Sequence, residues 1–175
     1  MNNLTTHVGL DAHMNSIVAC ALFPNGQPPR RWELPNRPRP VQRMVRRLLE
    51  ETEGQVTFCY EAGPCGYVLQ RQIRKEGAEC NIVAPSLIPQ KPGERIKTDR
   101  RDAYKLAEYD RGGHLTYVHP PDSSQESVRD LCRCREATMQ DVQRCRHRLS
   151  KLLLRRGMHF EGGKRSWTQK HRQWL

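Results

Sequence analysis

Apolar residues recur with two different periods over the first 120 residues of the chain. Short β-rich runs predict five strands, at residues 8–12, 16–23, 31–34, 55–60 and 78–83. The pair Asn25-Gly26, which follows the second run, is the strongest short signal for a hairpin.

Helical spacing of apolar residues alternates with these runs. It predicts helices near residues 41–49, 68–77 and 98–109. The second helix is expected to bury Val68, Leu69 and Ile73, and the third to begin with Thr98 or Asp99 as its N-cap. A hairpin followed by alternating helices and strands predicts an α/β fold with a mixed sheet.

Residues 121–175 differ from the first part, because they form one long basic helical pattern and a tail that contains Gly and Trp. Steps of three and four residues from Val128 to Leu152 form a heptad seam with two polar positions in its middle. Such a seam favours a helical hairpin or an intermolecular coiled coil. We therefore expect a coiled-coil arm at residues 121–160, with homo-oligomer formation through it. The capping residues are expected between Ser124 and Ser127.

Four carboxylates stand where metal chemistry is expected. Asp11 lies within an apolar strand, and Glu61 ends a strand at the edge where α/β sheets present functional groups. Asp99 and Asp102 are three residues apart at a helix start and share one face. Converging carboxylates suit Mg²⁺ or Mn²⁺ and phosphodiester chemistry, although each could be only a cap or an ion-pair partner. His13 is near Asp11 in sequence, but a lone histidine is more often structural.

The charge is also uneven. The chain carries 30 Lys and Arg against 19 Asp and Glu, a net charge of +11, of which +7 falls in residues 121–175. The excess is almost all of one sign, so we interpret it as a surface that contacts the phosphates of a nucleic acid rather than a merely solvated face. The candidate residues are Lys97, Arg100, Arg101, Arg129, Arg133, Arg144, Arg148, Lys151 and Arg155.

Several classes of protein are excluded at this stage. No run approaches the 18 or more apolar residues that a membrane helix needs, and the first residues do not form a secretory signal. The seven Cys are scattered and odd in number, as expected for reduced thiols in a cytoplasm.

Five sequence runs together resemble a known family, the DEDD-type transposases of bacterial insertion sequences. These are the RNA-guided bridge recombinases with an RNase H-like (RuvC-like) N-terminal domain. The runs are residues 8–11 (VGLD), 60–67 (YEAGPCGY), 83–93 (VAPSLIPQKPG), 96–103 (IKTDRRDA) and 167–175 (WTQKHRQWL). The resemblance spans nearly the whole chain, in order.

The resemblance implies an RNase H-like metal-binding domain at residues 5–120. Its catalytic and metal-binding acids fall on Asp11, Glu61, Asp99 and Asp102, with Mg²⁺ or Mn²⁺ as cofactor. It also implies DNA transposition and recombination directed by a structured guide RNA, in a bacterial cytoplasm and at the nucleoid. Family members continue into a C-terminal domain with a nucleophilic Ser, so residues 161–175 are expected to lead toward a domain that this chain lacks.

Two other interpretations remain open from the sequence. One is a catalytically silent nucleic-acid-binding remnant of a truncated insertion element. The other is a stand-alone metal nuclease of the junction-resolving type, which shares the fold and the acids.

Overall fold

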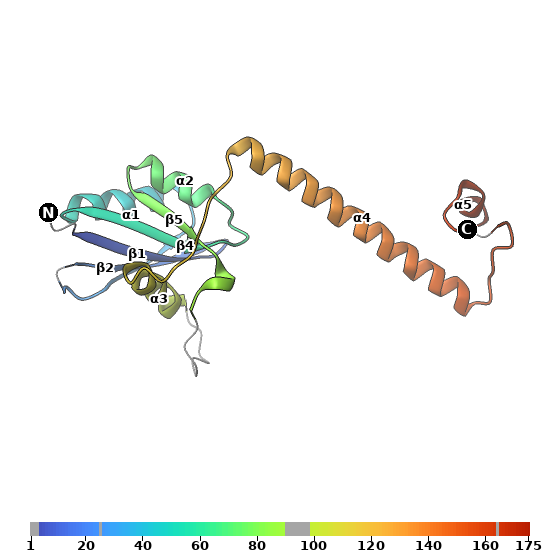
Figure 1. Ribbon diagram of the computed structural model, residues 1–175, viewed down its shortest axis with the longest axis horizontal. Coiled ribbons are helices and arrows are strands. Elements are labelled where there is room, and N and C mark those ends of the chain that lie inside the picture. The colour runs from blue at the N-terminus through green and yellow to red at the C-terminus, as the bar shows by residue number, and fades with distance from the viewer. Residues whose placement is uncertain (1–3, 25, 90–98, 164) are drawn as a thin grey trace. The chain divides into compact units, whose positions relative to one another are not determined.

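The computed structural model describes residues 4–24, 26–89, 99–163 and 165–175. Within the chain, residues 1–120 and residues 121–175 form two compact units (Figure 1). The candidate nucleic-acid residue Lys97, the candidate cap Thr98 and the turn residue Asn25 lie outside the described residues.

The first unit is built on a six-stranded mixed sheet in the order β3-β2-β1-β4-β5-β6. β1 is parallel to β4 and β4 to β5, whereas β1–β2, β2–β3 and β5–β6 are antiparallel. This arrangement confirms the α/β, RNase H-like expectation. The strands are β1 Thr5–Ala12, β2 Ser16–Leu22, β3 Arg30–Pro35, β4 Gln55–Glu61, β5 Glu79–Val83 and β6 Tyr117–Val118.

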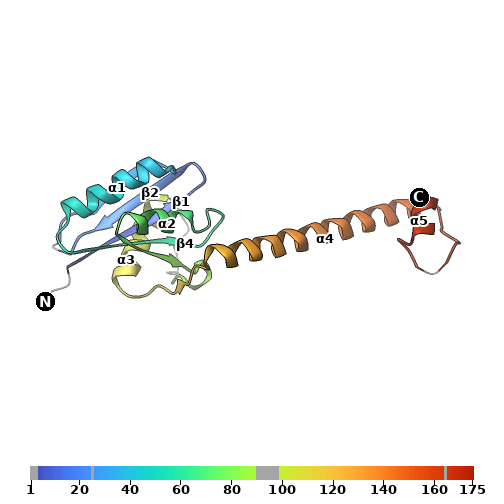
Figure 2. The same ribbon diagram turned by 90° about the horizontal axis from the view of Figure 1, so that it is seen from above.

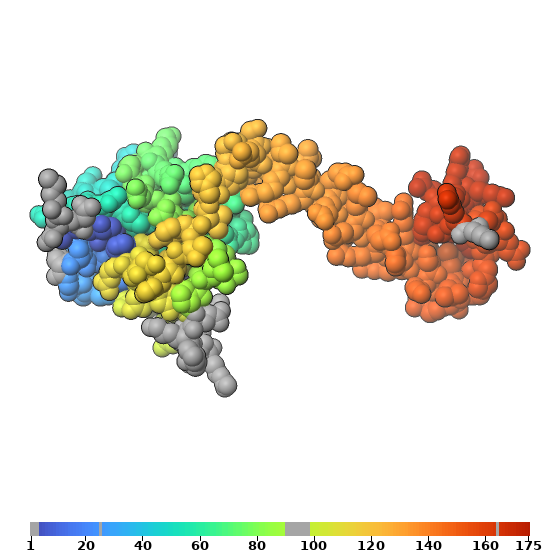
Figure 3. Space-filling model, in the orientation of Figure 1, coloured from blue at the N-terminus to red at the C-terminus, as the bar shows by residue number. Residues whose placement is uncertain are grey.

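Helices cover both faces of this sheet (Figures 1 and 2). The bounds are α1 Pro38–Glu51, α2 Val68–Lys75, the short 3-10 turn Pro85–Leu87 and α3 Asp99–Arg111. Successive side chains of a strand point to opposite faces of the sheet. Val8 and Leu10 of β1 lie in the core that faces α1 and α2. Val18 and Cys20 of β2 pack on the other face, against Ala103 of α3. In the space-filling view the yellow surface of the α3 region lies beside the blue surface of the first strands (Figure 3).

Gly9 lets α3 approach β1 unusually closely. A Cβ atom at this position would lie 2.1 Å from the backbone oxygen of Ala103 and 2.6 Å from the backbone nitrogen of Ala107. Such distances are far below van der Waals contact, so only glycine fits. Because Asp11 is two residues further along β1 and Asp102 precedes Ala103, this contact brings the two acidic segments together.

A buried polar network holds the other end of α3. The Asp110 carboxylate, whose side chain is 1% exposed, lies 2.5 Å from Nδ1 of His7. The Tyr117 hydroxyl donates to its second oxygen at 2.6 Å. Burial, followed by this carboxylate, raises the pKa of Tyr117 well above its ordinary value. The network ties the C-terminal end of α3 to β1 and β6.

One expectation about the first unit needs correction, and one strand was not predicted. Val68 is exposed, because it begins α2, and the buried stripe contains Gln70 in addition to Leu69 and Ile73. β6 was not predicted, because two residues carry no period. The expected β2–β3 hairpin forms, and its last strand pair joins Ala21 to Arg30.

The second unit consists of α4 Ser123–Arg155, a 33-residue helix, and a tail with α5 Gln169–Trp174. α4 is continuous, so the helical hairpin, one of the two arrangements that the seam favours, does not form within Ser123–Arg155. Its cap is Asp122, which forms a capping box with Gln125, and not a residue between Ser124 and Ser127.

In the tail, rings of Phe160, Trp167 and Trp174 surround His171. No described helix is long and apolar enough to cross a membrane.

Candidate metal centre

The end of β1 presents Asp11 on the α3 side of the sheet. Gly9 contacts α3 from this side, and residue alternation places Asp11 on the same face. The Asp11 side chain is 21% exposed. It is therefore partly desolvated but still open to a ligand from solvent.

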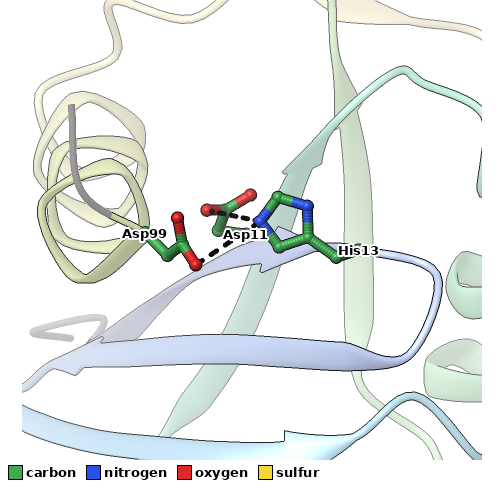
Figure 4. Close-up of side chains that lie close together, drawn as sticks. All are labelled: Asp11, His13 and Asp99. Atoms are coloured by element: carbon green, nitrogen blue, oxygen red, sulfur yellow. Dashed lines mark ion pairs between the residues drawn. The ribbon is translucent and has the colours of Figure 1, made fainter.

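Asp11 meets a histidine and a second carboxylate (Figure 4). Nε2 of His13 lies 3.3 Å from Oδ2 of Asp11 and 3.7 Å from Oδ2 of Asp99. One donor atom from each of these three residues lies within 4.8 Å of the others. Nε2 of His13 thus faces both carboxylates at once.

The β1–β2 turn fixes His13 in this position. Its backbone N–H donates to the carbonyl of Ser16 at 2.9 Å. Its own carbonyl accepts a hydrogen bond of 2.7 Å from the side-chain amide of Asn36. Both bonds hold the backbone of the turn, and the imidazole itself contacts Asp11 and Asp99.

Burial and three neighbouring side chains shift the pKa of Asp11. Burial is the main cause of a raised pKa at this carboxyl. His13 acts in the opposite direction, and the charges of Asp99 and Asp102 raise the pKa further. Asp99 and Asp102 stand in the first turn of α3, so Asp102 adds to the same negative potential. A divalent cation would relieve this repulsion.

Glu61 comes to the same edge of the sheet from β4. The parallel pairing of β1 and β4 ends at Leu10 opposite Tyr60, so Asp11 and Glu61 are the next residues on the two strands. Cys59, two residues before Glu61, donates from its thiol to the Leu106 carbonyl of α3, which places this side of β4 toward the same helix. Glu61 is exposed.

The structure thus groups the predicted acids unevenly. Asp11 and Asp99 lie in one tight group of donor atoms, which among the described residues includes neither Glu61 nor Asp102. His13 belongs to this group although no role was predicted for it. Its only sequence signal is its position two residues after Asp11, at the end of a strand.

The candidate nucleic-acid residues fall into two sets. Arg100 and Arg101 are exposed in the first turn of α3, directly after Asp99. On α4, Arg144 forms an ion pair of 2.8 Å with Asp141, and Arg129 is half-buried. The remaining α4 candidates are exposed: Arg133, Arg148, Lys151 and Arg155.

Comparison with known proteins identifies the family. Residues 8–157 match the sequence model of the IS110-type DEDD transposases, described as transposase. The chain belongs to this transposase family. The matched region contains His13 and all four carboxylates predicted from the resemblance.

Two curated proteins of insertion elements are similar to this transposase-family chain. A Sinorhizobium fredii protein named as transposase y4qE is 42% identical over 170 residues, which cover 96% of this chain and 43% of the relative. The transposase for insertion sequence element IS1533 of Leptospira borgpetersenii is 33% identical over 171 residues, which cover 97% and 49%. The chain spans about half the length of the curated relatives it matches.

Among solved structures, the catalytic core domain of BIV integrase aligns with a TM-score of 0.33 and 12% sequence identity. The alignment covers 62% of this chain and 66% of that one. The RNase H-like assignment of this transposase-family chain comes from its strand order.

Proposed function

We propose that the chain is the part of a transposase that binds a divalent metal ion and positions a phosphodiester of DNA. The group formed by Asp11, His13 and Asp99 carries this proposal, because its donor atoms already lie within 4.8 Å of one another. Glu61 and Asp102 are proposed to complete the acidic set, as the family resemblance implies.

The donor set fits the proposed ion. Carboxylate oxygens are the ligands that Mg²⁺ and Mn²⁺ take in proteins, and the imidazole nitrogen makes the set equally suited to Mn²⁺. Asp11 is only partly buried, so water and phosphate oxygens have access to the remaining coordination positions. Neither ion requires all of its ligands from the protein.

Each residue has a distinct task in this proposal. Asp11 and Asp99 hold the ion between β1 and α3, and Asn36 holds the backbone of the turn that carries His13. Arg100 and Arg101, at the start of α3, attract the phosphate beside the acids. When bound, the ion supplies Lewis-acid stabilisation of charge at a phosphodiester and lowers the pKa of coordinated water.

DNA and a structured guide RNA are the proposed partners, and α4 is proposed as a phosphate-binding surface. Replacing the four exposed candidates Arg133, Arg148, Lys151 and Arg155 by Ala removes up to four phosphate contacts. We expect the slope of log affinity against log salt to become shallower by up to about 3.6, since each contact contributes about 0.9. Fluorescence anisotropy with duplex DNA and with folded RNA measures both slopes. Unchanged slopes in both titrations would show that α4 does not bind phosphates.

We also propose that the chain forms a homo-oligomer through α4. The helix buries none of its residues, and its seam exposes Val128, Leu131, Val142, Leu149 and Leu152. An apolar seam with 3–4 spacing is buried when a second helix packs along it.

Sedimentation equilibrium tests the oligomer. We expect wild type to be a dimer or a larger assembly, and the pair Leu131→Asp and Leu149→Asp to be monomeric. Leu154 is an exposed apolar residue about 200° around the helix from the seam residue Leu152, so Leu154→Asp is the control and should keep the assembly. A monomeric wild type, or equal loss in the control, would contradict a coiled coil through this seam.

A further inference from the structure

A third cationic surface, besides those of α3 and α4, lies on α1, in the layer opposite α3. Its buried stripe, Val41, Met44, Val45 and Leu48, faces the sheet. Its outer side carries a row of arginines, all exposed: Arg37, Arg39, Arg43, Arg46 and Arg47. No acidic residue stands between Glu33 and Glu50 in the sequence. The outer side of this helix is therefore locally of one sign.

The arginines of this row differ in their partners. Nε of Arg46 lies 2.6 Å from Glu76, and Nε of Arg47 lies 2.6 Å from Glu51. In contrast, no carboxylate of the described residues lies within ion-pair distance of the other three, Arg37, Arg39 and Arg43, here called the α1 arginine triad. The first turn of α1 contains no acid either. The triad thus presents three uncompensated guanidinium groups to an external anion.

The triad begins beside the candidate metal centre. Asn36, which precedes Arg37, donates from its backbone to the Asn15 carbonyl at 2.9 Å and from its side chain to the His13 carbonyl at 2.7 Å. The start of α1 is therefore bonded to the turn that carries His13. α1 and α3 cover opposite faces of the sheet (Figure 1), so acids and arginines flank this turn from two sides.

The spacing of the arginines fits a nucleic-acid backbone. Arg39 and Arg43 are four residues apart on one helix face, a rise of about 6 Å. Phosphates of one strand follow one another at about 3.4 Å along a duplex axis, so the triad reaches two or three of them. Guanidinium groups match phosphate oxygens in a bidentate manner and contact the backbone without reading the bases.

We propose that Arg37, Arg39 and Arg43 bind the phosphodiester backbone of the nucleic-acid segment adjacent to the phosphate held at the metal centre. The placement of that segment rests on the proposed function, whereas the binding of phosphates by the triad does not. The triad adds to α3 and α4 a third surface, which directs a strand past the β1–β2 turn.

The test compares two triple variants of the full chain that remove equal charge. One replaces Arg37, Arg39 and Arg43 by Ala. The control replaces Arg74, Lys75 and Arg111 by Ala, three exposed cations at the ends of α2 and α3, which lie at the opposite edge of the sheet. Affinity for duplex DNA and for folded RNA is measured by anisotropy over a salt series, in separate titrations.

We expect the triad variant to make the slope of log affinity against log salt shallower by about 1.8–2.7, since two or three contacts at about 0.9 each are lost. The control variant is expected to change the slope by less than about one contact, or 0.9. A change of slope in only the DNA or only the RNA titration supports phosphate binding by the triad and identifies which nucleic acid it binds. Equal slopes for the triad variant and the control variant would overturn the proposal that the triad binds phosphates.

A measurement of metal response separates this proposal from the function on which it rests. Both variants are expected to keep the thermal stabilisation by Mn²⁺, because none of the replaced residues belongs to the group of metal donors. If Mn²⁺ stabilises wild type but the triad variant has the same salt slope as wild type, only the proposal that the triad binds phosphates is wrong. If wild type is not stabilised, the metal centre is wrong, and the slope comparison still decides the triad.

Discussion

Gly9→Ala is expected to destabilise the first unit by about 3 kcal/mol or more, at the upper end of the cost of overpacking a core. The added methyl group would stand 2.1 Å from the Ala103 oxygen. Backbone atoms cannot rotate away as a side chain can, so α3 has to move off β1. Urea denaturation followed by circular dichroism measures the loss.

Gly63→Ala is the matched control for this prediction. Gly63 lies near the same edge of the sheet, and the nearest atom to its added Cβ is 3.9 Å away, an ordinary contact. It is expected to change the free energy of unfolding little. Equal stability of the two variants would contradict the close approach of α3 to β1.

Asp11→Asn is expected to abolish stabilisation by metal. In wild type, an ion at one hundred times its Kd contributes about 2.7 kcal/mol, or a rise in Tm of about 5–10 °C for a protein of this size. The variant lacks one of the two charged donors of the tight group, so its Tm should be nearly independent of Mg²⁺ and Mn²⁺. Differential scanning fluorimetry with a series of metal concentrations measures both responses.

The same variant has a predicted effect without metal. Burial raises the pKa of Asp11, so the ionised carboxylate is less favourable in the folded than in the unfolded chain. The stability that this shift contributes is present at low pH and is lost as pH rises through the folded pKa. At neutral pH, the metal-free Asp11→Asn variant should therefore be at least as stable as wild type. A lower metal-free Tm would contradict the crowding of negative charge.

Regular patterns made much of the fold predictable. Period-two runs and 3–4 spacing gave five of the strands and the first three helices within a few residues. The exceptions have local causes: β6 is too short to show a period, and Val68 lies outside the stripe that α2 buries. The N-cap of α4 is Asp122 rather than a residue between Ser124 and Ser127. The side chains of Asp122 and Gln125 form a capping box, which satisfies backbone N–H groups at the start of the helix.

The candidate site was only partly predictable, because it depends on distances between elements. Strand ends and helix starts indicated Asp11, Glu61, Asp99 and Asp102 as a set. No sequence pattern could indicate that His13 would stand between Asp11 and Asp99, since this depends on the β1–β2 turn and on the hydrogen bond from Asn36. The role of Gly9 was equally hidden, because it comes from a contact with a helix about 90 residues further along the chain.

Direct titration of Mn²⁺, followed by electron paramagnetic resonance, tests the metal centre most closely. Wild type is expected to bind Mn²⁺ saturably, with a nitrogen coupling from His13 that disappears in His13→Gln. Asp11→Asn and Asp99→Asn should each weaken binding strongly, whereas Glu50→Gln, at an exposed acid of α1, should not. Saturable binding that is the same in all four variants, or no binding by wild type, would contradict a metal centre at the junction of β1 and α3.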